Sequence, residues 1–232
     1  MKWAAAAMLI VMVTGCGGGG DQLVVSAASS LTNALTACSA DDVKLSFGGS
    51  DELAAQIREG VKPDVYAAAN TKLPDQLARK GLVDKPVVFA TNELVIAVPD
   101  GSGITDIDDL AKPGVKLAIG AESVPVGSYT RDVLARLPAA RQRAILANVR
   151  SEEPDVSGVV GKLTQGAADA GFVYRTDLVD GLRAVTLPQD LQPVVKYGAA
   201  VVKRSEAAQR YLDGLTGGAC ADALRSAGFG AP

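Results

Sequence analysis

The sequence predicts an α/β fold of two small lobes, each a mostly parallel sheet flanked by helices. Short apolar runs rich in β-branched residues alternate along the 232-residue chain with segments of helical periodicity. Such alternation is typical of βαβ units, whose strands pair in parallel. The elements are also many and short, which favours two lobes over one barrel.

The first lobe is expected to comprise residues 22–99 and 193–232. Strands are predicted where apolar residues follow one another, and helices where they recur every three or four residues, as Leu53 and Ile57 do. Gly81 is expected to end one helix. The predicted strands cover 23–26, 43–47, 65–68, 91–98 and part of 192–203. One predicted helix begins at Leu31, and the others cover 51–59, 73–80, 206–215 and 220–227.

The second lobe is expected to comprise residues 100–192. The chain is expected to cross between the lobes near Pro99, which ends an apolar run, and again in the proline-flanked segment 188–193. The predicted strands of this lobe cover 116–120, 170–174 and 184–187; a helical turn covers 106–110, and helices cover 128–136, 139–148 and 157–165.

Composition excludes several classes of function. The formal net charge is −3, so the chain lacks the basic balance that nucleic-acid binding needs. It has no histidine, which excludes a Ser-His-Asp or Cys-His catalytic site and a histidine-ligated metal site. Its three cysteines are too few for a four-thiolate zinc site. No enzymatic activity is therefore expected.

The N-terminus has the pattern of an export signal. Lys2 is the only charged residue before Asp21, and the apolar run 3–13 is too short to cross a membrane. The segment 13–16 resembles a lipobox, so residues 1–15 are expected to be removed and Cys16 to carry the lipid. Residues 16–21, with their glycine run, would then be a flexible tether. The alternative is an ordinary signal peptide with a chance cysteine.

Export also bears on the other two cysteines. With Cys16 acylated, Cys38 and Cys220 remain as a pair in an oxidising compartment. A disulfide between them is expected, the alternative being two buried free thiols.

Small and hydroxylated residues recur where a predicted strand gives way to a helix. Ligands of open α/β sheets bind beyond the carboxyl ends of the strands, where helix N-termini present free N–H groups. Several such ends together would form a neutral, donor-rich pocket suited to an oxyanion. Each one alone is more typical of an ordinary helix cap. The four places are Ser29-Ser30, Gly49-Ser50, 125–128 and 155–157.

Taken together, these segments resemble the molybdate-binding proteins of ABC importers. The matching segments, in chain order, are 27–34, 47–57, 63–69, 124–129, 155–156 and 171–177. The resemblance implies the two-lobed periplasmic-binding-protein fold of type II, with a ligand cleft between the lobes. It further implies a tetrahedral dianion held without any counter-charge, with no cofactor and no metal beyond the oxyanion itself.

Carried over by position, the resemblance assigns the donors to five residues. Ser30 and Ser50 would donate from their hydroxyl and backbone groups, Val126 and Val156 from their backbone N–H groups, and Tyr174 from its phenol. Three departures from the family pattern stand out. Gly49 replaces a common serine, Val126 replaces a common alanine, and the first helix is short.

The function implied is capture of molybdate or tungstate outside the cytoplasmic membrane, at the cell surface or in the periplasm. A lipid-anchored monomer would deliver the ion to an ABC permease and its ATPase. One alternative is a receptor for another oxyanion such as sulfate. Another, from a different class, is a surface enzyme or adhesion module on the same fold.

Overall fold

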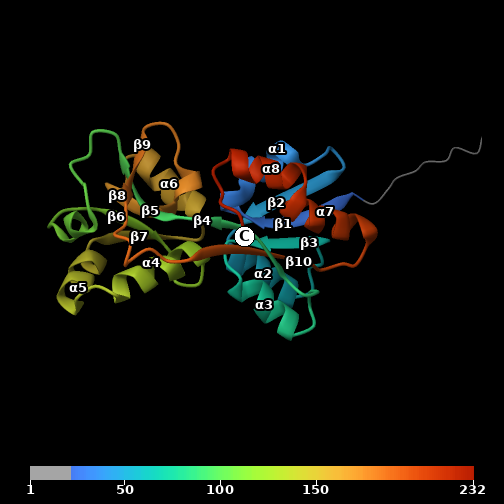
Figure 1. Cartoon of the computed structure of the whole chain (residues 1–232). Coiled ribbons are helices and arrows are strands. Elements are labelled where there is room, and N and C mark those ends of the chain that lie inside the picture. The colour runs from blue at the N-terminus through green and yellow to red at the C-terminus, as the bar shows by residue number, and fades with distance from the viewer. Residues whose placement is uncertain (1–21) are drawn as a thin grey trace, which may run out of the picture.

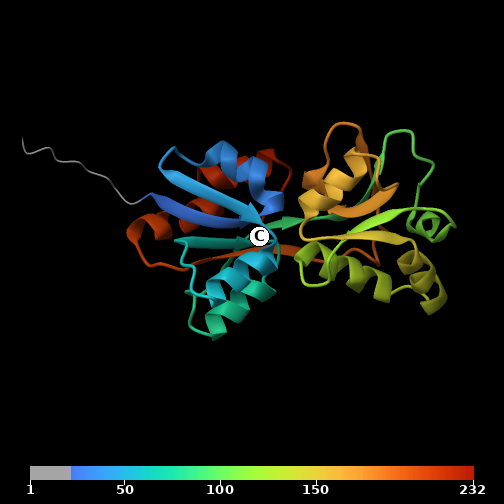
Figure 2. The same cartoon turned by 180° about the vertical axis from the view of Figure 1, so that it is seen from behind.

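The computed structural model describes residues 22–232, which form two α/β lobes side by side (Figure 1). Each lobe contains one five-stranded sheet with helices on both faces, as the view from behind also shows (Figure 2). The expected signal peptide and tether lie outside the described residues. Within residues 22–232, no helix combines the length and the apolar character needed to span a membrane.

The sheet of the first lobe has the strand order β2-β1-β3-β10-β4. β1, β2 and β3 are parallel, whereas β10 runs antiparallel to both of its neighbours. Helices α1, α7 and α8 cover one face and α2 and α3 the other (Figure 1). The elements are β1 Leu23–Ala28, α1 Thr32–Cys38, β2 Val43–Gly48, α2 Ser50–Arg58, β3 Val65–Ala68, α3 Lys72–Arg79, β4 Val87–Asn92, β10 Val195–Val201, α7 Glu206–Gly217 and α8 Ala219–Ser226, with a 3-10 turn, η1, at Ser29–Leu31.

The second sheet repeats this topology in the order β7-β6-β8-β5-β9, with β5 antiparallel to both of its neighbours. Four strands in each sheet therefore point the same way, so that their carboxyl ends share one edge. The elements are β5 Leu94–Pro99, β6 Leu117–Gly120, α4 Pro125–Ala135, α5 Ala139–Ala147, β7 Val149–Glu153, α6 Val156–Thr164, β8 Ala170–Tyr174 and β9 Leu182–Thr186, with 3-10 turns η2 at Ile107–Ala111 and η3 at Arg175–Asp177.

The first crossing between the lobes lies at Glu93, not near Pro99. Residues 91–98 read as one apolar strand, but the chain changes sheets inside this run. Asn92 still pairs with Val195 of β10, whereas Leu94 pairs with Tyr174 of β8. Residues 94–99 therefore belong to the second lobe, which corrects the expected boundary. The second crossing lies between β9 and β10 and includes the expected segment 188–193.

Of strand β4, only the last two residues lie in a predicted strand, and strand β7 was not predicted from the sequence at all. It lies at an edge of the second sheet, and its residues alternate between half-buried and exposed. Three of its five residues are charged, among them Glu152 and Glu153, which suits an edge strand exposed to water. An apolar pattern could not reveal it for the same reason.

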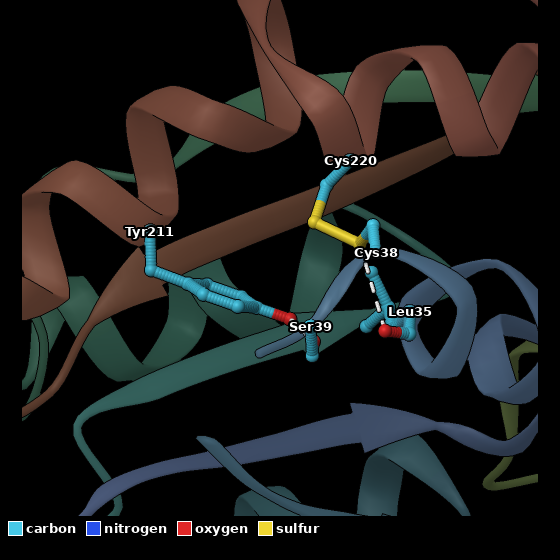
Figure 3. Close-up of a disulfide and its surroundings, with 5 residues drawn as sticks. All are labelled: Leu35, Cys38, Ser39, Tyr211 and Cys220. Carbon is cyan, nitrogen blue, oxygen red and sulfur yellow. Dashed lines mark hydrogen bonds between the residues drawn. A yellow bond between two sulfur atoms is a disulfide. The ribbon is translucent and has the colours of Figure 1, made fainter. Parts of the chain in front are cut away.

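A disulfide joins Cys38 at the end of α1 to Cys220 at the start of α8 (Figure 3). Their Cα atoms are 5.0 Å apart, and the pairing is the one expected from the sequence. Beside it, the Tyr211 hydroxyl of α7 lies 3.2 Å from Ser39 Oγ. α1 has only seven residues, and these links hold it against the C-terminal helices.

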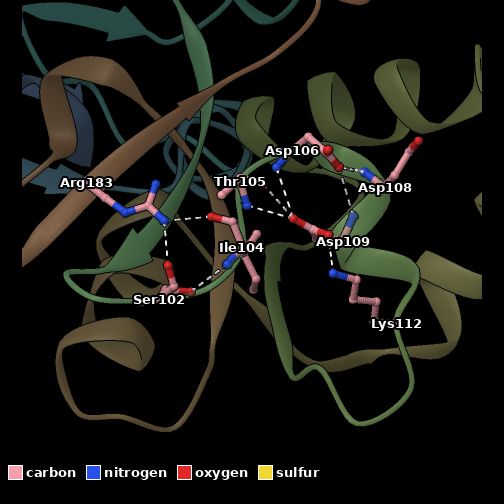
Figure 4. A network of polar contacts seen from close by, with 8 residues as sticks. All are labelled: Ser102, Ile104, Thr105, Asp106, Asp108, Asp109, Lys112 and Arg183. Carbon is pink, nitrogen blue, oxygen red and sulfur yellow. Dashed lines mark hydrogen bonds and ion pairs between the residues drawn. The ribbon is translucent and has the colours of Figure 1, made fainter.

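A polar network orders the long connection between β5 and β6 in the second lobe (Figure 4). Asp109 accepts from the Thr105 backbone N–H at 2.7 Å and forms an ion pair with Lys112. These partners lower the pKa of Asp109, so its stabilising effect is present at neutral pH and is lost as the pH falls through that lowered pKa. Arg183 of β9 donates to the carbonyl groups of Ser102 and Ile104, both at 2.7 Å.

Candidate functional site

A small cavity lies where the two lobes meet, at the carboxyl ends of the strands. Its volume is only about 10 Å³, far below the roughly 300 Å³ at which pockets for drug-sized ligands begin. The cavity therefore fits a small ion better than an organic molecule. It brings together all five of the expected site residues: Ser30 and Ser50 from the first lobe, and Val126, Val156 and Tyr174 from the second.

Ser50 is the first residue of α2 and is almost fully buried. The Ala69 backbone N–H donates to its Oγ at 3.1 Å, and the Tyr66 hydroxyl donates to its carbonyl oxygen at 2.6 Å. An N–H group can only donate, so the Ser50 hydroxyl proton is left to point elsewhere. The side chain is thus fixed with its O–H free to donate into the cavity.

Ser30 lies in the 3-10 turn that follows β1. It is buried, and its Oγ lies 2.9 Å from the hydroxyl of Tyr197 on β10. Sequence reasoning missed Tyr197, because 167 residues separate it from Ser30 and only the folded sheet brings the two together.

Val126 and Val156 lie in the first turns of α4 and α6, where backbone N–H groups have no partner within the helix. The first turn of α6 is partly satisfied locally, because the Asp155 carboxylate accepts from the Gly158 N–H at 3.0 Å. The N–H groups at Val126 and Val156 remain as donors at the cavity. Gly127 permits this arrangement, since any Cβ there would overlap the Ala121 carbonyl group.

Tyr174 ends β8 and is 1% exposed. Its hydroxyl is buried and has no hydrogen-bond partner among residues 22–232. Burial raises its pKa well above 10, so it keeps its proton and can donate. A buried polar group without a partner costs about 1–3 kcal/mol, and an acceptor bound in the cavity would remove that cost.

The cavity provides no positive side chain. Among the described residues, no lysine or arginine lines it, and its one charged lining residue is Asp155. Asp177, three residues after Tyr174, accepts from the Tyr174 backbone N–H, and burial raises its pKa to about 7. Residues 22–232 also contain no cluster of acidic residues or cysteines able to hold a metal ion. An anion here would be held by hydroxyl and backbone donors and by helix dipoles.

The lobes touch closely beside the cavity. A Cβ on Gly49, in the first lobe, would lie 2.5 Å from the Pro154 carbonyl oxygen in the second. At the crossing, Asn92 Nδ2 donates to Thr176 Oγ1 at 2.8 Å, and Arg175 pairs with Glu93. The glycine that replaces a common serine thus removes one donor but allows the two backbones to meet.

Comparison with known proteins agrees with this geometry. The family model for bacterial extracellular solute-binding proteins matches residues 23–230. The chain belongs to this family. It is 35% identical to the molybdate-binding protein ModA of Mycobacterium tuberculosis H37Rv, over 89% of this chain and 83% of that one.

Two solved structures share the fold of this solute-binding protein. The Azotobacter vinelandii periplasmic molybdate-binding protein aligns with a TM-score of 0.75 at 21% identity, covering 90% of this chain and 99% of that one. The sulfate-binding protein SubI of M. tuberculosis aligns with a TM-score of 0.75 at 18% identity, covering 89% and 85%. At these identities the structures establish the fold and not the ligand.

Proposed function

We propose that this solute-binding protein captures molybdate or tungstate between its lobes and delivers it to an ABC permease driven by an ATPase. The observation that carries the proposal is the set of uncharged donors in one small cavity, among them the Tyr174 phenol, which has no partner within residues 22–232. The 35% identity to a molybdate-binding protein supports the choice of ion.

The donor set favours a dianion that carries no proton. Hydrogen bonds to a charged group contribute about 1.5–3 kcal/mol each, so about half a dozen could hold the ion with a Kd below about 1 µM after desolvation. Molybdate, tungstate and sulfate only accept hydrogen bonds at neutral pH. Phosphate keeps a proton and needs an acceptor. Sulfate is a smaller tetrahedron, which a rigid shell built for molybdate would not contact at every donor.

The mode of capture proposed is closure of the two lobes about their crossings, as in other hinged binding proteins. The close approach of Gly49 to Pro154 supports it, because the two residues belong to different lobes. We further propose that the protein acts as a monomer, tethered by a lipid on Cys16 to the outer side of the cytoplasmic membrane.

Tyr174→Phe tests the observation that carries the proposal. The change removes a hydroxyl that has no hydrogen-bond partner among residues 22–232, so the melting temperature of the free protein should stay the same or rise slightly. Loss of one charge-assisted hydrogen bond should weaken molybdate binding by about tenfold or more. Calorimetric titration and thermal unfolding measure the two effects.

The matched control is Tyr211→Phe, which removes a tyrosine hydroxyl from the same protein far from the cavity lining. It should leave molybdate affinity unchanged. If Tyr174→Phe binds molybdate as tightly as the unchanged protein does, the phenol is no ligand and the site assignment fails.

A further inference from the structure

The contact between Ser30 Oγ and the Tyr197 hydroxyl, at 2.9 Å, joins a candidate ligand to a residue outside the cavity lining. Either oxygen could donate, and the choice decides what Ser30 presents to a ligand. If Ser30 donates to Tyr197, only its lone pairs remain for the cavity. If Tyr197 donates, the Ser30 proton is free to point into the cavity.

Asn92, at the end of β4, settles the direction. The Glu93 backbone N–H donates to Asn92 Oδ1 at 2.8 Å, which fixes the orientation of the amide. Asn92 Nδ2 therefore faces the other way and donates to Thr176 Oγ1 at 2.8 Å and to the Tyr197 hydroxyl oxygen at 3.4 Å. An amide nitrogen only donates, so the Tyr197 oxygen is the acceptor in this contact.

The Tyr197 proton then has one acceptor among the contacts described for residues 22–232, and it is Ser30 Oγ. Tyr197 is fully buried, so its hydroxyl proton cannot turn to water instead. A buried O–H left without an acceptor is costly. The hydrogen bond therefore runs from Tyr197 to Ser30.

We infer that Tyr197, oriented by Asn92, is a positioning residue that makes Ser30 a hydrogen-bond donor toward the cavity. The inference rests on the proposed function and deepens it. Ser50 has an equivalent arrangement, in which the Ala69 N–H takes the place of the Tyr197 hydroxyl. Both serines thus present protons to the ligand, which selects oxyanions that only accept and disfavours those that carry a proton.

The test is a double-mutant cycle of Tyr197→Phe and Ser30→Ala, with molybdate affinity measured by calorimetry. Tyr197→Phe keeps the ring and its edge-to-face contacts with Phe89, Tyr174 and Phe229. It should weaken binding about threefold to tenfold, since one neutral hydrogen bond orients the donor. In the Ser30→Ala background the same change should have no further effect.

Anion selectivity provides a second measurement, which would not change if Tyr197 only stabilised the fold. With the Ser30 hydroxyl free to turn, the preference for molybdate over hydrogen phosphate, measured by competition, should fall in Tyr197→Phe. Tyr211→Phe, the matched loss of a hydroxyl on α7, should change neither affinity nor preference.

Three results would overturn the inference: unchanged affinity in Tyr197→Phe, an equal loss with and without Ser30, or an unchanged preference over phosphate. Each of these leaves the proposed function intact, provided that Ser30→Ala weakens binding. If the unchanged protein does not bind molybdate, the proposed function itself fails, and the inference fails with it.

Discussion

At the scale of single residues, the cavity is defined by which polar groups already have hydrogen-bond partners within the protein and which do not. One lone pair of Ser50 Oγ is engaged by a backbone N–H, while the Tyr174 hydroxyl has no partner in the described chain. The sequence could predict both residues, because each follows a short strand and lies in a recognisable segment. It could not predict Tyr197 or Asn92, whose roles depend on contacts between residues 84 to 167 positions apart.

Gly49→Ala tests the close approach of the lobes. The backbone angles at Gly49 (φ −62°, ψ 129°) suit alanine, so the substitution should leave the first lobe stable. Its Cβ would lie 2.5 Å from the Pro154 carbonyl oxygen, so the lobes could not meet as they do here. Molybdate affinity measured by calorimetry should fall by about tenfold or more, because closure would leave some donors out of reach.

The control for this variant is Gly214→Ala on α7, where a Cβ meets nothing within 4 Å. It should bind as the unchanged protein does. If Gly49→Ala also binds normally, the close approach is not part of the ligand-bound form.

At the scale of elements, three helices long enough to carry a dipole begin at the cavity. Small residues after apolar runs predicted their starts to within a few positions: α4 begins at Pro125 rather than 128, and α6 at Val156 rather than 157. Errors arose where local pattern is weak. β7 is a charged edge strand, and the switch of sheets at Glu93 falls inside the segment 91–98, which was predicted as one strand. Both β7 and the change of sheets are determined by pairing with strands that are distant in the sequence.

The disulfide belongs to this scale, because it joins α1 to α8 across 182 positions of sequence. In the chain-entropy description, closing so long a loop stabilises the folded state by up to about 5 kcal/mol. The double variant Cys38→Ala with Cys220→Ala should therefore have a clearly lower melting temperature. Neither cysteine lines the cavity, so molybdate affinity at 25 °C should stay within about twofold.

Thermal unfolding with and without a thiol reductant provides the matching control. Reductant should lower the melting temperature of the unchanged protein and have no effect on the double variant. If the melting temperature of the wild-type protein stays the same after its disulfide has been fully reduced, the disulfide does not stabilise the fold.

At the scale of the whole molecule, two lobes of one topology place the carboxyl ends of their strands against each other. This arrangement explains how residues as far apart in sequence as Ser30 and Tyr174 come to line one small cavity. The sequence predicted the two lobes and the second crossing, and the family resemblance supplied the cleft. The proposed tether at Cys16 belongs to the same scale, because it would keep the whole binding domain at the membrane.

Cys16→Ala tests that tether. Without the acylated cysteine, the protein should move from the membrane fraction to the soluble extracytoplasmic fraction, while its molybdate affinity stays unchanged. Fractionation of cells and immunodetection measure the distribution, with Cys38→Ala as a control for loss of a cysteine as such. Retention of Cys16→Ala in the membrane fraction would place the anchor elsewhere.

The central claim is that the cavity binds an unprotonated tetrahedral dianion of the size of molybdate. Calorimetric titration of the purified protein with molybdate, tungstate, sulfate and phosphate tests it most directly. One-to-one binding of molybdate and tungstate with a Kd below about 1 µM is expected, together with much weaker binding of sulfate and of phosphate. Sulfate binding as tight as that of molybdate, or no binding of any of the four anions, would contradict it.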